Sequence, residues 1–88
     1  MSCRRVIVHG RVQGVGFRVA VARAARTRNV TGWVRNRPDG TVEALFEGDD
    51  EAVASLVRLC REGPRGAEVV RVDEAEAAPA GGRGFEIR

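Results

Sequence analysis

The chain has 88 residues, a length that supports one domain with a single core of two packed layers. Hydrophobic residues make up 43% of it, enough for a globular core without disulfides or a metal, and no apolar run reaches the length of a membrane span. Every basic residue is an arginine: residues 1–38 hold nine and no acid, and residues 39–88 hold six and all 12 acids. The basic first half predicts an anionic partner there, such as phosphate, a nucleotide or a nucleic acid.

The N-terminal third predicts a strand, a loop and a helix. Residues 4–9 form a β-branched run that is typical of a strand. Residues 10–16 contain three glycines and no helical period, and they therefore predict a loop. From Phe17 onward apolar residues recur at helical spacing, so we expect a helix over residues 17–28.

A β-hairpin is expected next. Residues 31–35 predict a strand in which Trp33 packs on one face of the sheet, and residues 42–47 alternate between apolar and polar side chains as a second strand does. The connection contains Pro38-Asp39-Gly40, which has the chemistry of a turn. Proline fixes φ, aspartate bonds to nearby main chain, and glycine accepts a positive φ.

The second half predicts another helix and two further strands. Asp49 is a candidate N-cap, apolar residues follow it at helical spacing as far as Cys60, and Gly63-Pro64 ends the helix. Residues 68–75 predict a strand, and residues 85–88 predict a short final strand after a glycine-rich loop.

The resulting element order is β-α-β-β-α-β followed by a short strand. This is the order of the split βαβ, or ferredoxin-like, α+β sandwich, in which two helices cover one face of an antiparallel sheet. We expect a single domain over residues 1–88, with strand order 4-1-3-2 and the last short strand at an edge.

The loop over residues 10–16 is a candidate anion site. Its glycines allow the main chain to fold tightly and to direct several N–H groups at one point, next to the positive end of a helix dipole. Arg18 lies in the first helical turn, where a cation is unfavourable unless an anion binds between it and the loop. The glycines alone are also consistent with a simple turn, and their spacing matches neither a Walker nor a Rossmann motif.

Two longer motifs resemble those of the acylphosphatase family. The first is Val8-His9-Gly10-Arg11-Val12-Gln13-Gly14-Val15-Gly16-Phe17-Arg18, and the second is Gly32-Trp33-Val34-Arg35-Asn36. Residues 38–43, Gly63-Pro64 and residues 85–88 also fit, so the resemblance covers essentially the whole chain. The chain departs from the family in having no aromatic residue directly after Arg18, which bears on helix packing and on the wall of the pocket.

The resemblance implies an enzyme that hydrolyses small acyl phosphates to carboxylate and inorganic phosphate. It implies that Arg18 binds the phosphoryl group and that Asn36 orients the attacking water, without a cofactor, a metal or a covalent intermediate. The loop amides implied to cradle the phosphoryl oxygens belong to Gln13, Gly14, Val15, Gly16 and Phe17. Asn36 suits its role because its side chain offers an acceptor and a donor without titrating, although a turn-flanking asparagine would look the same in sequence.

Two other classes of function stay open at this point. One is an RNA-binding ferredoxin-like module, since residues 14–17 faintly resemble a glycine–aromatic RNA-binding pattern. They precede a helix, however, and aromatic residues make up only 5% of the chain, so we expect no nucleic acid partner. The other is a module that binds an acyl or carbamoyl phosphate without hydrolysing it. We favour a free-standing enzyme because no further domain follows the fold.

The remaining candidate residues are expected to be structural. His9 is the one histidine and lies at a strand end. Cys3 and Cys60 have no Cys-x-x-Cys spacing, which favours free thiols in a reducing compartment. No signal-peptide pattern precedes the first strand, so we expect a cytoplasmic protein without a membrane partner. Its small size and mixed surface charge favour a monomer.

Overall fold

The computed structural model describes residues 1–88. Its strands and helices follow one another in the order that the sequence pattern predicts. The strands are β1 (Ser2–Arg11), β2 (Thr31–Asn36), β3 (Val42–Gly48), β4 (Glu68–Glu76) and β5 (Phe85–Ile87), and the helices are α1 (Phe17–Thr27) and α2 (Asp50–Glu62). β1 is longer than predicted at both ends, because Ser2 and Cys3 pair with β3, and Gly10 and Arg11 continue to pair with β4 beyond a register shift after His9. The loop that follows β1 therefore begins at Val12 rather than at Gly10.

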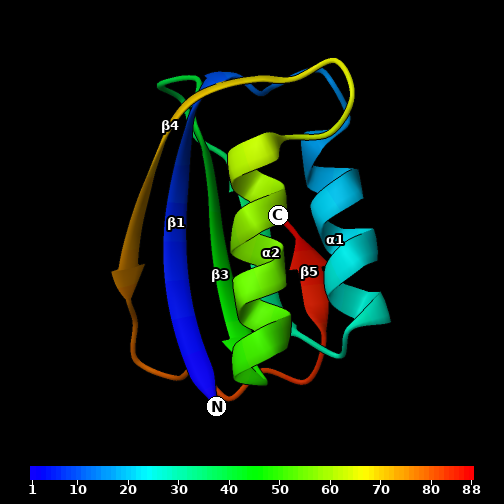
Figure 1. Ribbon diagram of the computed structural model, residues 1–88, viewed down its shortest axis with the longest axis vertical. Helices are drawn as coiled ribbons and strands as arrows, with labels where there is room; N and C mark the ends of the chain where they lie inside the picture. The colour runs from blue at the N-terminus through cyan, green and yellow to red at the C-terminus, as the bar shows by residue number, and fades with distance from the viewer.

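The five strands form one sheet with the order β4-β1-β3-β2-β5, and both helices lie on one face of it (Figure 1). The predicted ferredoxin-like α+β fold, the strand order and the edge position of the last strand are confirmed. The prediction that the whole sheet is antiparallel is wrong for β5, which pairs in parallel with β2. The chain leaves β4 at the N-terminal end of β1 and crosses to the opposite edge there, so β5 runs in the same direction as β2 (Figure 1).

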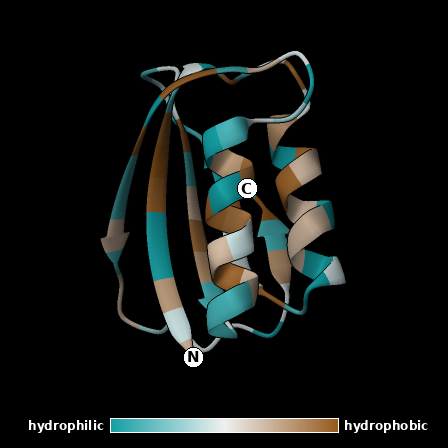
Figure 2. Cartoon of the chain, in the orientation of Figure 1, coloured by the Kyte–Doolittle hydropathy of each residue, from teal (hydrophilic) through white to brown (hydrophobic).

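The core fills the space between the helices and the sheet. Both helices show alternating hydrophilic and hydrophobic bands (Figure 2). The fully buried side chains of the largest volume include Phe17 from α1, Phe46 from β3 and Leu56 from α2. The rings of Phe46 and Phe85 stack with their centroids 5.8 Å apart, which joins β5 to the core. Burial of each such side chain contributes about 1.5–3 kcal/mol to folding.

The other face of the sheet is covered by charged and aromatic side chains rather than by helices. Glu43 alternates with the core residues of β3 but is only 3% exposed, because the guanidinium groups of Arg5 and Arg35 both bind its carboxylate. The guanidinium carbon of Arg35 lies 5.6 Å from the centroid of the Trp33 ring, and that of Arg88 lies 5.1 Å from it. Trp33 thus contacts two cations at the β2–β5 edge.

The start of α2 differs from its prediction. Asp49 occupies the predicted N-cap position, but its side chain makes no capping hydrogen bond. The neighbouring Asp50 carboxylate instead accepts a hydrogen bond from the Ser2 hydroxyl at 2.6 Å. This contact fastens the first turn of α2 to the beginning of β1. Neither helix has both the length and the apolar character needed to cross a membrane.

Candidate active site

The loop between β1 and α1 exposes a series of unpaired main-chain donors. Gly14 and Gly16 have φ values of 75° and 78°, a region that glycine occupies without strain. Gly16 is the N-cap of α1 and offers no side chain to cap the helix, and the first turn contains no acidic residue. None of the main-chain N–H groups over residues 13–19 donates a hydrogen bond within the protein. Such a series of donors at a helix N-terminus is suited to binding an anion.

Asn36 is the last residue of β2, opposite Val42 of β3. Its Oδ1 atom is buried and has no hydrogen-bond partner, the one buried side-chain polar atom of the chain in this state. An unsatisfied buried acceptor costs about 1–3 kcal/mol, so it needs a compensating reason. A hydrogen bond to a bound molecule is one such reason.

Arg18 and Asn36 line the same small hollow. The hollow has a volume of about 80 Å³ and is lined by Val12, Gly14, Gly16, Phe17, Arg18, Val19 and Asn36. It is far smaller than the roughly 300–1,000 Å³ of pockets for drug-sized ligands, and its size suits a small tetrahedral anion. No Asp, Glu, His or Cys lines it, so Arg18 supplies the only formal charge.

Contacts with the end of the sheet orient the Arg18 side chain. The Nη1 atom of Arg18 donates a hydrogen bond to the main-chain oxygen of Arg88 at 3.3 Å, and the Arg88 N–H donates to Val34 O at 2.8 Å. The guanidinium is therefore held by the residue that follows β5, which is itself paired to β2. Because guanidinium carries five N–H donors, this single bond leaves others available for an anion in the hollow.

The hollow contains five of the seven residues predicted for the site. Gly14, Gly16, Phe17, Arg18 and Asn36 line it, and the Phe17 side chain is anchored in the core at 2% exposure. Gln13 and Val15 do not line it. The Gln13 amide bonds to the β2–β3 turn, and Val15 packs against the core.

Two residues that line the hollow were not predicted. Val12 is buried, whereas Val19 is 53% exposed and forms part of the outer wall. The one sequence signal for Val19 is its position directly after Arg18, on a turn of α1 that must face the loop.

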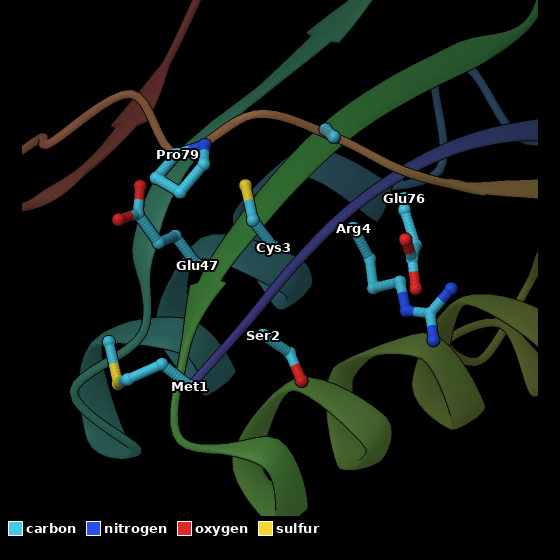
Figure 3. Close-up of a pocket in the computed structure, with 8 residues that line it drawn as sticks. Met1, Ser2, Cys3, Arg4, Glu47, Glu76 and Pro79 are labelled. Atoms are coloured by element: carbon cyan, nitrogen blue, oxygen red, sulfur yellow. The ribbon is translucent and has the colours of Figure 1, made fainter.

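A larger hollow lies at the opposite end of β1 and does not include Arg18 or Asn36. Its volume is about 300 Å³, and Cys3, Arg4 and Glu47 are among its lining residues (Figure 3). Burial, and secondarily the charge of Glu47, raises the pKa of the Cys3 thiol, which makes it a poor nucleophile. Cys3 therefore does not supply a reactive nucleophile to this second hollow.

No other cluster of reactive side chains competes with the small hollow. His9 pairs with Asp73 at 2.9 Å, as expected of a structural residue, and it does not line the hollow. No three His, Cys, Asp or Glu side chains of residues 1–88 lie close enough together to hold a metal ion. The chemistry available to the site is thus that of Arg18, Asn36 and main-chain amides.

Comparisons with known proteins point to one family. The acylphosphatase family model matches residues 4–87. An acylphosphatase from Rubrobacter xylanophilus is 56% identical over 85 residues, which cover 96% of this chain and 77% of that protein. The crystal structure of acylphosphatase from Bacillus subtilis superimposes with a TM-score of 0.95 at 42% identity, covering 100% of this chain and 99% of that one. An acylphosphatase structure from Coxiella burnetii gives a TM-score of 0.94 at 36% identity, covering 99% and 92%.

Proposed function

This chain belongs to the acylphosphatase family of enzymes, and we propose that it hydrolyses the carboxyl–phosphate bond of small acyl phosphates. The products are a carboxylate and inorganic phosphate. The observation that carries the proposal is the buried, unpartnered Oδ1 of Asn36 in a hollow that it shares with Arg18 and a loop of free N–H donors. Asn36 supplies an acceptor for a hydrogen bond from water, Arg18 supplies a cation, and the loop supplies main-chain donors that can surround an anion.

Arg18 and the loop amides would hold the phosphoryl group. An acyl phosphate carries its negative charge on the phosphoryl oxygens, and a planar guanidinium can bind two of them at once. The free N–H groups over residues 13–19 approach from the helix side and complement the same charge. In phosphoryl transfer the transition state spreads charge over the equatorial oxygens, so preorganised donors of this kind accelerate the reaction.

Asn36 would position the nucleophile. Its Oδ1 accepts a hydrogen bond from a water molecule and aims the water oxygen at phosphorus, in line with the bond to the leaving group. The new P–O bond forms as the bond between phosphorus and the carboxyl oxygen breaks, and the electron pair leaves with the carboxylate. One proton of the water passes to a phosphoryl oxygen. A carboxylate is a good leaving group, so no general acid is needed.

The size of the hollow limits what the site recognises. A volume of about 80 Å³ accommodates the phosphoryl group but not a large acyl group as well. The acyl part would therefore extend past the half-exposed Val19 toward solvent. This arrangement favours small acyl phosphates with little discrimination among them.

A benzoyl phosphate hydrolysis assay tests the proposal. We expect the wild-type protein to release phosphate equally with and without a metal chelator. Arg18→Lys should lower kcat/KM by at least about 100-fold, because a point charge does not reproduce the planar fork. Arg23→Lys, the same change at an exposed position of α1, is the matched control and should have no effect.

Three results would contradict the proposal. Full activity in Arg18→Ala would exclude Arg18 from phosphate binding. Loss of wild-type activity with the chelator alone would exclude a metal-free reaction. Absence of hydrolysis together with binding of inorganic phosphate would favour the non-catalytic acyl phosphate-binding module instead.

A further inference from the structure

The proposed site is assembled from two segments that are far apart in the sequence. The phosphoryl group would be held by residues 13–19, whereas Asn36 lies at the end of β2. The β1–β3 pairing ends at Val8 and Val42, so no hydrogen bond between these two strands reaches the loop. In-line attack requires both segments to stay in register to within about 0.5 Å. The Arg18–Arg88–Val34 hydrogen bonds join the helix end of this segment to β2, and a contact nearer to Asn36 would fix its other end.

The side chain of Gln13 makes that contact. Its Nε2 atom donates hydrogen bonds to the main-chain oxygens of Arg37 at 2.8 Å and Thr41 at 3.0 Å. An amide NH₂ has two donors, so both are used. Gln13 is the one residue of the loop whose side chain is hydrogen-bonded to this turn, and no main-chain hydrogen bond joins the two.

The turn that Gln13 contacts is closed by internal hydrogen bonds and directly follows Asn36. The Arg37 N–H donates to Thr41 O at 2.9 Å, which closes the turn. The Asp39 carboxylate accepts hydrogen bonds from the Thr41 N–H at 3.0 Å and from the Thr41 hydroxyl at 2.6 Å. Because these hydrogen bonds link the residues of the turn to one another, a restraint on its two carbonyls is also a restraint on the position of Asn36.

We propose that Gln13 is a positioning residue whose side-chain amide ties the phosphate-binding loop to the turn after Asn36 and so aligns the attacking water with the phosphoryl group. The inference rests on the proposed function. The side chain of Gln13 reaches no reacting atom in this arrangement, because it is bonded to the turn and does not line the hollow. It acts through the turn and Asn36.

A double-mutant cycle between Gln13 and Asn36 tests this role. Gln13→Met keeps the size and lack of charge of the side chain but removes both donors. We expect it to lower kcat for benzoyl phosphate by about 10- to 100-fold, as misplacement by a fraction of an ångström to 1 Å does. KM and the inhibition constant of inorganic phosphate should stay within about 3-fold, because Arg18 and the loop amides remain.

The effect should depend on the presence of Asn36. In an Asn36→Ala background there is no positioned water to misalign, so we expect Gln13→Met to change kcat by less than about 3-fold. Gln13→Ala serves as a second variant in case Gln13→Met fails to fold, which thermal unfolding reveals. Thr31→Val is the matched control: it removes a side-chain donor to Glu47 O at the far end of the sheet and should leave kcat unchanged.

The outcomes separate this inference from the proposed function. Equal kcat losses from Gln13→Met in the wild-type and Asn36→Ala backgrounds would overturn the positioning role, as would a rise in KM with kcat unchanged. Either result would leave the proposed hydrolysis intact. Absence of hydrolysis by the wild-type protein would instead refute the proposed function, and the positioning role with it.

Discussion

Replacement of Asn36 by Leu should raise stability while it abolishes most of the activity. Leucine has the branched shape of asparagine with bulkier ends, and it brings no acceptor into the place where Oδ1 now lies buried without a partner. Removing an unsatisfied buried acceptor recovers part of its cost of about 1–3 kcal/mol, and we expect a net gain of about 1 kcal/mol because the side chain is only half-buried. For a domain of this size that gain corresponds to a rise in Tm of about 4–8 °C.

The same substitution removes the group that would orient water. We expect kcat for benzoyl phosphate to fall by about 100- to 1,000-fold, with the inhibition constant of inorganic phosphate nearly unchanged. Thermal unfolding and phosphate release, measured on the same preparation, give the two readouts. A variant that loses stability and keeps its activity would show that Asn36 is a structural strand-end residue and would refute the reasoning.

Three further predictions concern stability and reactivity. Burial by itself raises the pKa of Glu43, but its hydrogen bonds with Arg35 and Arg5 outweigh this and lower the pKa overall. The ionised Glu43 therefore stabilises the fold at pH values above its unfolded pKa, and this contribution is lost as the pH falls through the lower folded pKa. Glu43→Gln should lower the free energy of unfolding by about 2 kcal/mol near neutral pH and should make it less dependent on pH in acid. Urea unfolding at several pH values measures both effects. If Glu43→Gln unfolds along the wild-type pH curve, the two arginines do not stabilise this carboxylate. A Cβ at Gly32 would lie 1.8 Å from Leu45 O, and Gly32 has a φ of 135°, so Gly32→Ala should destabilise the fold by at least about 3 kcal/mol. Gly82→Ala is the control, because nothing lies within 4 Å of a Cβ there, and it should leave the stability unchanged. Equal Tm values for the two variants would contradict this prediction. Burial raises the pKa of Cys60 to about 12, so an alkylating reagent at mildly alkaline pH should modify Cys60 only in unfolded protein. Mass spectrometry measures the modification, and modified Cys60 in the native protein would indicate local opening of α2.

The elements could be predicted wherever one local pattern determined them. The apolar residues of α2 recur at helical spacing and Gly63-Pro64 follows, so the extent of that helix could be predicted without knowledge of its neighbours. The parallel pairing of β5 could not, because it depends on the path that the chain takes after β4. Glu43 illustrates the same limit at the level of a side chain. Its alternation with core residues predicts an exposed carboxylate, and only the approach of Arg5 and Arg35 from two other strands buries it.

The candidate site divides in a similar way. The position of Arg18 in a first helical turn and the glycines of the loop indicate an anion site from local reasoning. The pairing of Arg18 with Asn36 came from the resemblance to a family, since no property of the intervening residues brings the two together. The contact of Gln13 with the β2–β3 turn could not have been predicted from either source. A glutamine in a glycine-rich loop reads as one more backbone donor until its side-chain partners are known.

The position of Trp33 makes its fluorescence an intrinsic probe of the candidate active site. It is the one tryptophan of a chain without tyrosine, so ultraviolet emission arises from a single indole. Arg88 stacks on that indole, and the main chain of Arg88 holds the Arg18 guanidinium. Any movement of Arg18 that displaces Arg88 would change the charge beside the indole and hence shift the wavelength of its emission maximum. Substrate analogues could therefore be titrated by fluorescence without a label, and detachment of β5 could be followed separately from global unfolding.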